Sequence, residues 1–258
     1  MTTEMACSNP PIDEGLILAR FARRAAGMTG ADVEYIVQQA KRAARREGRL
    51  LEYSDVEKAL DGARPRAPDE NRWRFAIHEA AHAVIGLTFR FERIQQITLS
   101  GRHGDPSVTS SLDERDIATE DRVMHLIIVG LAGRAAEELF FETPCIYSGG
   151  APESDLGRVT RLAYLLETSF GFGKAHKLVY REQPDFVTGL TSEPGLLERV
   201  NRRLEMSFRA AFHLLAAHRG AVEHLANELI QVETLDGEHL EDVLNEVRAI
   251  MERELPPR

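Results

Sequence analysis

The sequence predicts a mainly helical fold that also contains a small β-hairpin. Apolar residues recur with helical spacing over most of the chain, and several of these stretches follow a capping residue such as Thr29 or Thr119. Residues 94–99 and 107–112 instead look like short strands, and the turn-forming segment 101–106 separates them. We therefore expect an α+β chain in which one hairpin is added to a set of helices.

Composition limits the classes of protein to which the chain can belong. The 258 residues suffice for one large domain or two smaller ones, and 43% apolar with 28% charged residues is typical of a soluble globular protein. A net charge of −9 argues against nucleic-acid binding as the main role. The longest apolar run, residues 126–132, is far shorter than the ~20 residues of a membrane span. Residues 1–11 lack the apolar core of a signal peptide. Cys7 and Cys145 offer no disulfide framework, which is typical of a reducing compartment. Together these observations predict a soluble, cytoplasmic protein with no nucleic-acid partner.

The first sixty residues predict a compact helical unit. A helix is expected over residues 13–26, and Thr29 with Asp32 forms a capping box at the start of a second helix. A further capping box beginning at Ser54 opens a short helix over residues 54–60. The second helix ends in a basic cluster, which we interpret as a solvated face and not as a nucleic-acid site: Lys41, Arg42, Arg45, Arg46 and Arg49. Pro, Gly and charged residues in segment 61–68 indicate a domain boundary, giving domains 1–63 and 64–258.

The larger second part is expected to hold most of the helices. Besides the two hairpin strands, a short strand is predicted at residues 177–180. Helical spacing of apolar residues predicts helices at 69–89, 119–141, 155–170, 196–217, 221–230 and 236–252.

Residues 78–82 read His-Glu-Ala-Ala-His inside an otherwise apolar stretch. On a helix, His78 and His82 project from one face one turn apart, and Glu79 beside them can reach a water bound to a shared metal ion. Burying two imidazoles and a carboxylate costs several kcal/mol unless they are paired or coordinated. A zinc ion would satisfy all three groups, whereas the alternative is a pair of ordinary core histidines.

A catalytic zinc site needs a third protein ligand and an open position. Asp155 stands in the first turn of the helix that follows a glycine-containing loop. Glu137 and Glu138 end the helix at 119–141 near apolar residues, and one of them could hydrogen-bond a metal-binding histidine. Spacing along the chain does not choose the third ligand among these and several other acids.

Four motifs resemble, in the same order, those of the FtsH family of AAA-type, membrane-anchored, ATP-dependent zinc metalloproteases. Residues 27–33 resemble the Gly-Phe-Ser-Gly-Ala-Asp-Leu segment of the AAA lid, and residues 78–83 resemble the family's His-Glu-Ala-Gly-His-Ala. Residues 132–138 are similar to Gly-Gly-Arg-x-Ala-Glu-Glu, and residues 150–156 resemble Gly-Ala-Ser-Asn-Asp-Ile with one residue inserted. The resemblance spans residues 16–251, and the set of four is far more specific than any one motif.

The resemblance implies a helical zinc-metalloprotease domain preceded by a small, partial AAA lid. Carried over by position, it implies that His78, His82 and Asp155 bind Zn²⁺ and that Glu79 acts as general base. Either Glu137 or Glu138 would then hydrogen-bond one of the metal-binding histidines without binding the metal itself.

The resemblance also implies partners. The strand around Val108 would be the edge to which an extended, unfolded polypeptide substrate adds by strand pairing. Members of the family form homo-hexamers in which an ATPase ring threads unfolded protein into a proteolytic chamber.

The departures from the family pattern define what is expected of this chain. It has no Walker A or Walker B motif, no nucleotide-binding core and no membrane segment, so it should not hydrolyse ATP. Ala81 replaces the usual glycine of the zinc motif. We expect either a fragment of a longer protein, whose ATPase core would be a partner at the cytoplasmic face of the inner membrane, or a natural short relative.

The expected function is a zinc-dependent endopeptidase that degrades unfolded or misfolded proteins. The alternative is a non-catalytic, FtsH-like ring-forming adaptor that binds unfolded chains. A third interpretation, a helical scaffold with a chance motif, predicts no bound metal.

Overall fold

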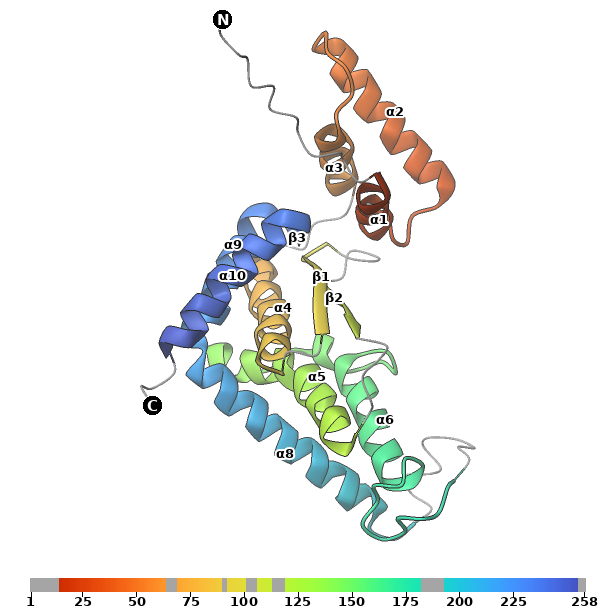
Figure 1. Ribbon diagram of the computed structural model, residues 1–258, viewed down its shortest axis with the longest axis vertical. Helices are drawn as coiled ribbons and strands as arrows, with labels where there is room; N and C mark the ends of the chain where they lie inside the picture. The colour runs from red at the N-terminus through yellow and green to blue at the C-terminus, as the bar shows by residue number, and fades with distance from the viewer. Residues whose placement is uncertain are drawn as a thin grey trace, which may run out of the picture. The chain divides into compact units, whose positions relative to one another are not determined.

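The computed structural model describes residues 14–63, 69–89, 92–100, 106–112, 119–181 and 193–254 (Figure 1). The described residues fall into two compact units, one formed by helices α1–α3 and the other by the remaining elements. Helices predominate, and the strands form one small antiparallel sheet, so the predicted mainly helical class with a small hairpin is confirmed. None of the described helices is long and apolar enough to cross a lipid bilayer.

The N-terminal unit consists of α1 (Glu14–Arg24), α2 (Gly30–Arg46) and α3 (Tyr53–Gly62), which bury a small apolar core. The predicted capping box at α2 is confirmed. The backbone N–H of Asp32 donates to Thr29 Oγ1 at 3.2 Å, and the backbone N–H of Thr29 donates to Asp32 Oδ2 at 2.8 Å. These bonds satisfy two backbone donors at the helix start.

Helix α3 begins differently from the prediction. Its N-cap is Glu52, two residues before Ser54, so the predicted start of the capping box is wrong. Arg49 explains the difference, because its guanidinium donates to both oxygens of Asp55, at 2.6 and 2.7 Å. The same carboxylate accepts the backbone N–H of Glu52 at 2.9 Å, which starts the helix at Tyr53.

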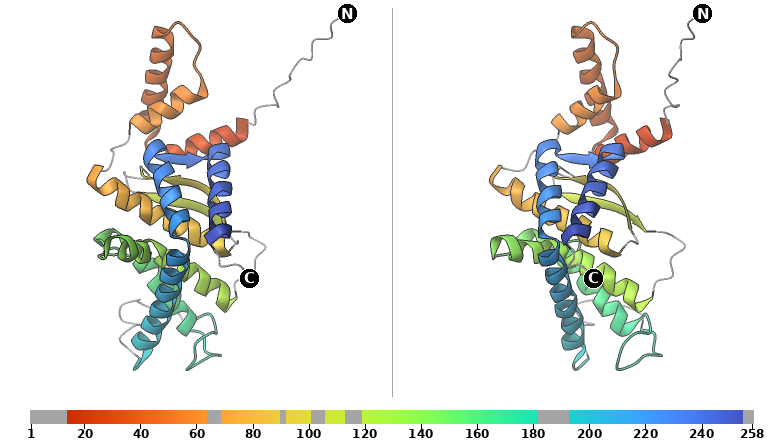
Figure 2. Two further views of the ribbon diagram at one scale, coloured as in Figure 1. Left: turned by 90° about the vertical axis from the view of Figure 1, so that its left-hand side faces the viewer. Right: turned by 60° about the vertical axis from the view of Figure 1, so that its left-hand side comes forward.

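The second unit is built around α4 (Asp69–Phe89), whose middle turns are buried on every side. It contacts α5 (Glu120–Phe141), α9 (Arg219–Val232) and the sheet. The remaining helices are α6 (Asp155–Thr168), α8 (Leu196–Ala217) and α10 (Gly237–Glu254). Figure 2 shows α9 and α10 side by side, and both belong with α4 to one apolar core. A polar side chain on α4 is therefore held by packing from several directions.

The sheet has the strand order β2-β1-β3. Strands β1 (Glu92–Thr98) and β2 (Ser107–Leu112) pair antiparallel, which confirms the predicted hairpin, with an irregularity between Ile94 and Gln96. Strand β3 (Thr234–Asp236) was not predicted, because three residues carry too little pattern. Among the described strands β2 pairs only with β1, and the backbone of Val108 on β2 hydrogen-bonds the side chain of Glu79.

The strand predicted at residues 177–180 is wrong. These residues form turns and irregular backbone, and the side chains of Leu178 and Tyr180 are exposed. A strand needs a partner for its backbone groups, and none of the described strands lies there. The predicted turn at 101–106 and the predicted boundary at 61–68 fall mostly outside the described residues.

Candidate metal centre

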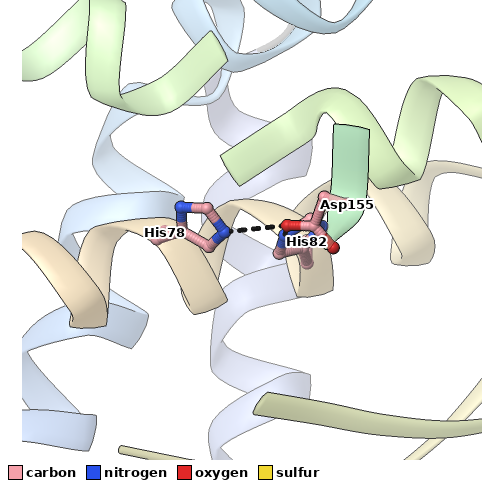
Figure 3. A group of neighbouring side chains, drawn as sticks. All are labelled: His78, His82 and Asp155. Atoms are coloured by element: carbon pink, nitrogen blue, oxygen red, sulfur yellow. Dashed lines mark hydrogen bonds and ion pairs between the residues drawn. The ribbon is translucent and has the colours of Figure 1, made fainter. Parts of the chain in front are cut away.

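Two helices bring three candidate ligands together. His78 and His82 lie one turn apart on α4, with ring centroids 4.9 Å apart. Asp155 is the first residue of α6, and the preceding Ser154 caps that helix by accepting the backbone N–H of Gly157 at 3.2 Å. Asp155 Oδ2 lies 3.1 Å from Nε2 of each histidine (Figure 3). One ligand atom from each of the three residues lies within 4.8 Å of the others.

Hydrogen bonds to the outer ring nitrogens orient both imidazoles. His82 Nδ1 lies 2.8 Å from the carbonyl oxygen of Val129, and His78 Nδ1 lies 2.7 Å from Glu137 Oε1. Because a carbonyl oxygen only accepts, His82 Nδ1 carries the proton, and the carboxylate of Glu137 favours the same arrangement in His78. This leaves Nε2 of each ring directed towards Asp155, the nitrogen that would bind a metal ion once it has lost its proton.

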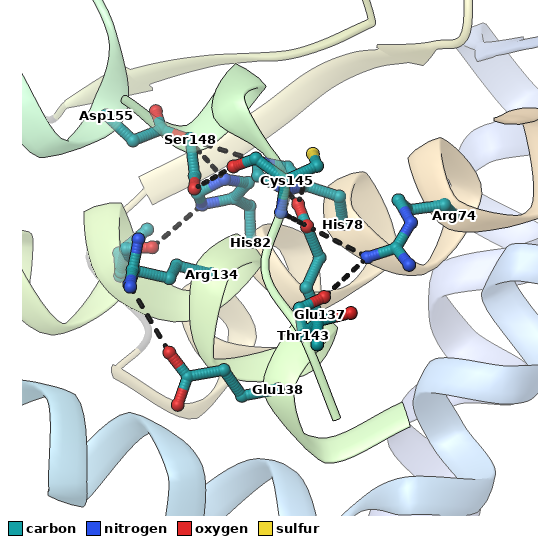
Figure 4. Close-up of polar contacts among 11 residues, drawn as sticks. Arg74, His78, His82, Arg134, Glu137, Glu138, Thr143, Cys145, Ser148 and Asp155 are labelled. Carbon is teal, nitrogen blue, oxygen red and sulfur yellow. Dashed lines mark hydrogen bonds and ion pairs between the residues drawn. The ribbon is translucent and has the colours of Figure 1, made fainter. Parts of the chain in front are cut away.

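Glu137 is the centre of a second group of polar contacts (Figure 4). Its side chain is fully buried, and it accepts hydrogen bonds from Arg74 Nη1 at 3.2 Å, from Cys145 Sγ at 3.3 Å and from the backbone N–H of Cys145. Glu138 instead pairs with Arg134 at 3.4 Å on the partly exposed side of α5. Of the two acids left open by the sequence, Glu137 is therefore the one that contacts His78.

Glu79 lies beside the histidines and is 6% exposed. Burial raises the pKa of its carboxyl, and the two neighbouring histidines only partly offset this effect. A carboxyl whose pKa lies closer to neutrality accepts and returns protons more readily than an ordinary glutamate.

The electrostatics of the cluster call for a cation. Burial opposes a charged ring at His78, but the carboxylates of Asp155 and Glu137 outweigh it and raise the pKa of His78 to about 10. Burial likewise opposes ionisation of Asp155, but the two imidazoles hold its pKa below the ordinary value. The three carboxyl groups of Asp155, Glu137 and Glu79 thus surround the two imidazoles. Two nitrogen donors and one carboxylate oxygen fit a first-row divalent ion such as zinc.

Gly133 of α5 lies against the His78 ring. A Cβ at this position would stand 2.2 Å from His78 Nε2 and 2.3 Å from its Cε1. Only a residue without a side chain allows α5 to approach α4 this closely. Gly133 and Glu137 are four residues apart, so one face of α5 both makes room for His78 and holds it.

The three candidate ligands line a cleft of about 860 Å³ with mostly apolar walls. Val108 of β2 and Leu126 of α5 lie along it, as does Tyr147 of the short turn η2 (Ile146–Ser148). The edge strand β2 therefore borders the same cleft as the histidines. The sequence did not predict the contacts that Arg74, Cys145, Gly133 and the Val129 carbonyl make. Only the four-residue spacing of Gly133 and Glu137 could have indicated that both lie on one face of a helix.

Comparison with known proteins agrees with this arrangement. The profile of peptidase family M41 matches residues 66–243, more than half of the chain. The chain belongs to peptidase family M41. It is 34% identical over 258 residues to the "ATP-dependent zinc metalloprotease FtsH 1" of Sorangium cellulosum, covering 90% of this chain and 41% of that protein.

Two further relatives are the FtsH 3 protein of Symbiobacterium thermophilum and the FtsH protein of Chloroflexus aggregans, each named an ATP-dependent zinc metalloprotease. The first is 30% identical and the second 27%, over 96% and 93% of this chain and 42% and 40% of their own lengths. The resemblance to the FtsH family seen in the sequence is therefore confirmed. The M41 chain spans about two fifths of the length of these curated relatives.

Proposed function

We propose that this chain is a zinc-dependent endopeptidase that cleaves unfolded or misfolded polypeptides. The observation that carries the proposal is the convergence of His78, His82 and Asp155 at the cleft, with Glu79 beside them. The relatives named zinc metalloproteases support the choice of metal and reaction.

His78 and His82 would hold the ion through Nε2, and Asp155 would hold it through its carboxylate. When bound, zinc supplies Lewis-acid chemistry that polarises the scissile carbonyl and makes water acidic enough to react near neutral pH. Glu79 accepts the proton of the attacking water and returns it to the leaving amine nitrogen. Glu137 and the Val129 carbonyl keep the two imidazoles in the orientation that this arrangement requires.

The position of β2 at the edge of the sheet supports an extended substrate. Val108 lies in this strand and lines the cleft, so a peptide paired with β2 would run past the histidines. Strand pairing uses backbone groups, which every polypeptide has but which a folded protein already engages in its own structure. An unfolded chain is therefore the expected substrate.

The remaining assignments concern a larger assembly. We propose that residues 1–63 are part of an AAA lid and residues 64–258 a metallopeptidase domain, together the proteolytic part of an FtsH-like ATP-dependent protease. Its partners would be five further copies in a homo-hexamer and an ATPase core. The expected location is the cytoplasm or the cytoplasmic face of the inner membrane.

Metal content and proteolysis test the proposal together. The purified protein should contain one zinc per chain and cleave casein, and a chelator should abolish cleavage. Glu79→Gln should keep zinc but lose cleavage, because an amide does not accept the proton of water. Glu138→Gln is the matched control, since Glu138 pairs with Arg134 away from the cluster. Full cleavage by Glu79→Gln would refute the role of Glu79. Zinc with casein binding but no cleavage would instead favour the ring-forming adaptor.

A further inference from the structure

The two oxygens of the Glu137 carboxylate have different partners (Figure 4). Oε1 lies 2.7 Å from Nδ1 of His78 and 3.3 Å from Sγ of Cys145, whereas Oε2 accepts hydrogen bonds from Arg74 Nη1 at 3.2 Å and from the backbone N–H of Cys145. The Glu137 side chain is only 1% exposed, so a donor that is lost there is not simply replaced by water. The contact of Oε1 with His78 therefore depends on what holds Oε2.

Arg74 and His78 hold this carboxylate from the same helix. They are four residues apart on α4, so their side chains leave one face of the helix one turn apart. One group of α4 thus meets each oxygen of Glu137, which fixes both the position and the rotation of the carboxylate. The positive charge of the guanidinium also offsets the burial of a negative charge, and its removal would favour movement of the carboxylate out of this place.

Arg74 also holds the turn that leads to Cys145. The same Nη1 donates to the carbonyl oxygen of Thr143 at 2.8 Å, and the guanidinium lies over the ring of Phe141, 4.2 Å from its centroid. Between these two residues Glu142 has a φ of 62°, a left-handed conformation that is strained for a residue with a side chain and persists only where its surroundings hold it. Arg74 therefore contacts the residue before and the residue after the strained position.

We propose that Arg74 is a positioning residue of the metal centre, which acts on His78 through Glu137. Its guanidinium holds Oε2 and the turn that supplies the backbone N–H of Cys145, and Oε1 then holds the His78 ring with Nε2 towards the ion. Neither Arg74 nor Glu137 is among the residues that line the cleft, so this effect reaches the centre through the imidazole. The inference rests on the proposed function, because it takes the three candidate ligands to hold zinc.

The test begins with Arg74→Met, which keeps the length of the side chain but has neither a charge nor a donor. Zinc affinity is measured by competition with a chelator, and the protein loaded with cobalt(II) gives a visible absorption spectrum that depends on the arrangement of the ligands. We expect zinc affinity to fall ~10-fold, the lower end of the effect of losing a direct partner of a ligand, because Arg74 lies one contact further out. The cobalt spectrum should change as well. Arg74→Gln is measured in parallel, so that the conclusion does not depend on the folding of one variant.

Two further variants separate positioning from a general loss of stability. Arg74→Lys should recover most of the zinc affinity and the wild-type cobalt spectrum, because a single nitrogen of the arginine makes both hydrogen bonds and an ammonium group has three donors. Arg134→Met is the matched control, since Arg134 also forms an ion pair on α5 but with Glu138, away from the cluster. Its zinc affinity and cobalt spectrum should equal those of the wild type.

A double-mutant cycle identifies the residue through which Arg74 acts. In Glu137→Met protein, the further substitution Arg74→Met should lower zinc affinity by no more than about 2-fold, because the carboxylate that transmits the effect is already gone. A purely structural effect of Arg74 would instead lower zinc affinity by the same factor in both backgrounds.

The outcomes separate this inference from the proposed function. Unchanged zinc affinity in Arg74→Met and Arg74→Gln, no recovery in Arg74→Lys, or equal losses in both backgrounds would overturn the role of Arg74 and leave the metal centre in place. Metal binding with this coupling, in a chain that cleaves no casein, would support the role of Arg74 and refute the endopeptidase. A wild-type chain that binds neither zinc nor cobalt(II) would refute both.

Discussion

Substitution of Gly133 by alanine should remove the metal site while the protein stays folded. The added Cβ would lie 2.2 Å from His78 Nε2, whereas atoms in ordinary contact are about 3.5 Å apart, so the ring must retreat by about 1 Å. Metal–ligand distances tolerate only about 0.2 Å. The ring is the end of a side chain and can turn away, and alanine favours a helix over glycine by about 1 kcal/mol. The expected effect is therefore on metal binding and not on folding.

The assay for Gly133→Ala is a zinc titration against a competing chelator, combined with thermal unfolding followed by circular dichroism. We expect zinc affinity to fall ~100-fold, as when a metal-binding histidine loses its orientation, with a cooperative unfolding transition preserved. Gly62→Ala is the control, because a Cβ there meets no atom within 4 Å. Wild-type zinc affinity in Gly133→Ala would refute the close approach of α5 to the His78 ring.

Further predictions concern Glu137, protons and a helix cap. Glu137→Gln should lower zinc affinity ~10- to 100-fold in the same titration, whereas Glu138→Gln should not. Because the pKa of His78 in the metal-free protein is raised to about 10, its proton stabilises the fold fully below about pH 6.5, and this stabilisation is lost as the pH rises towards 10. The metal-free protein should therefore melt at a lower temperature at pH 9 than at pH 6.5; an equal or higher melting temperature would contradict the assignment. Zinc binding at pH 8 should release protons, seen as a buffer-dependent enthalpy in calorimetry. Thr29→Ala should destabilise the N-terminal unit by about 1 kcal/mol in urea unfolding, and Thr29→Ser should not.

Helices could be predicted closely because their signals are local. The predicted ranges 69–89 and 196–217 coincide with α4 and α8, and Thr119 caps α5 as expected. Apolar spacing and capping residues lie within a few positions of one another, so no knowledge of the tertiary structure is needed to recognise them. The spacing of His78 and His82 on one helical face is information of the same kind.

The parts that failed depend on residues far apart in the sequence. Strand β3 is only three residues long and exists because it pairs with β1, some 140 positions earlier (residues 96 and 236 pair). Which of Glu137 and Glu138 contacts His78 depends on the face of α5 that meets α4, and no spacing along the chain reveals it. The approach of Asp155 to both histidines is likewise a tertiary contact, across 73 and 77 positions. The roles of these residues as ligands remain predictions for the zinc titration to test.

The turn η2 divides its residues into those that can be varied and those that are constrained. Cys145 and Glu137 are joined to each other and to His78, so a substitution at either position alters the metal centre as well as the turn. Ile146 and Tyr147 line the cleft, and the ring of Tyr147 contacts the ring of Phe75 on α4. Substitutions at Ile146 should therefore leave zinc affinity unchanged, whereas substitutions at Cys145 should lower it through Glu137.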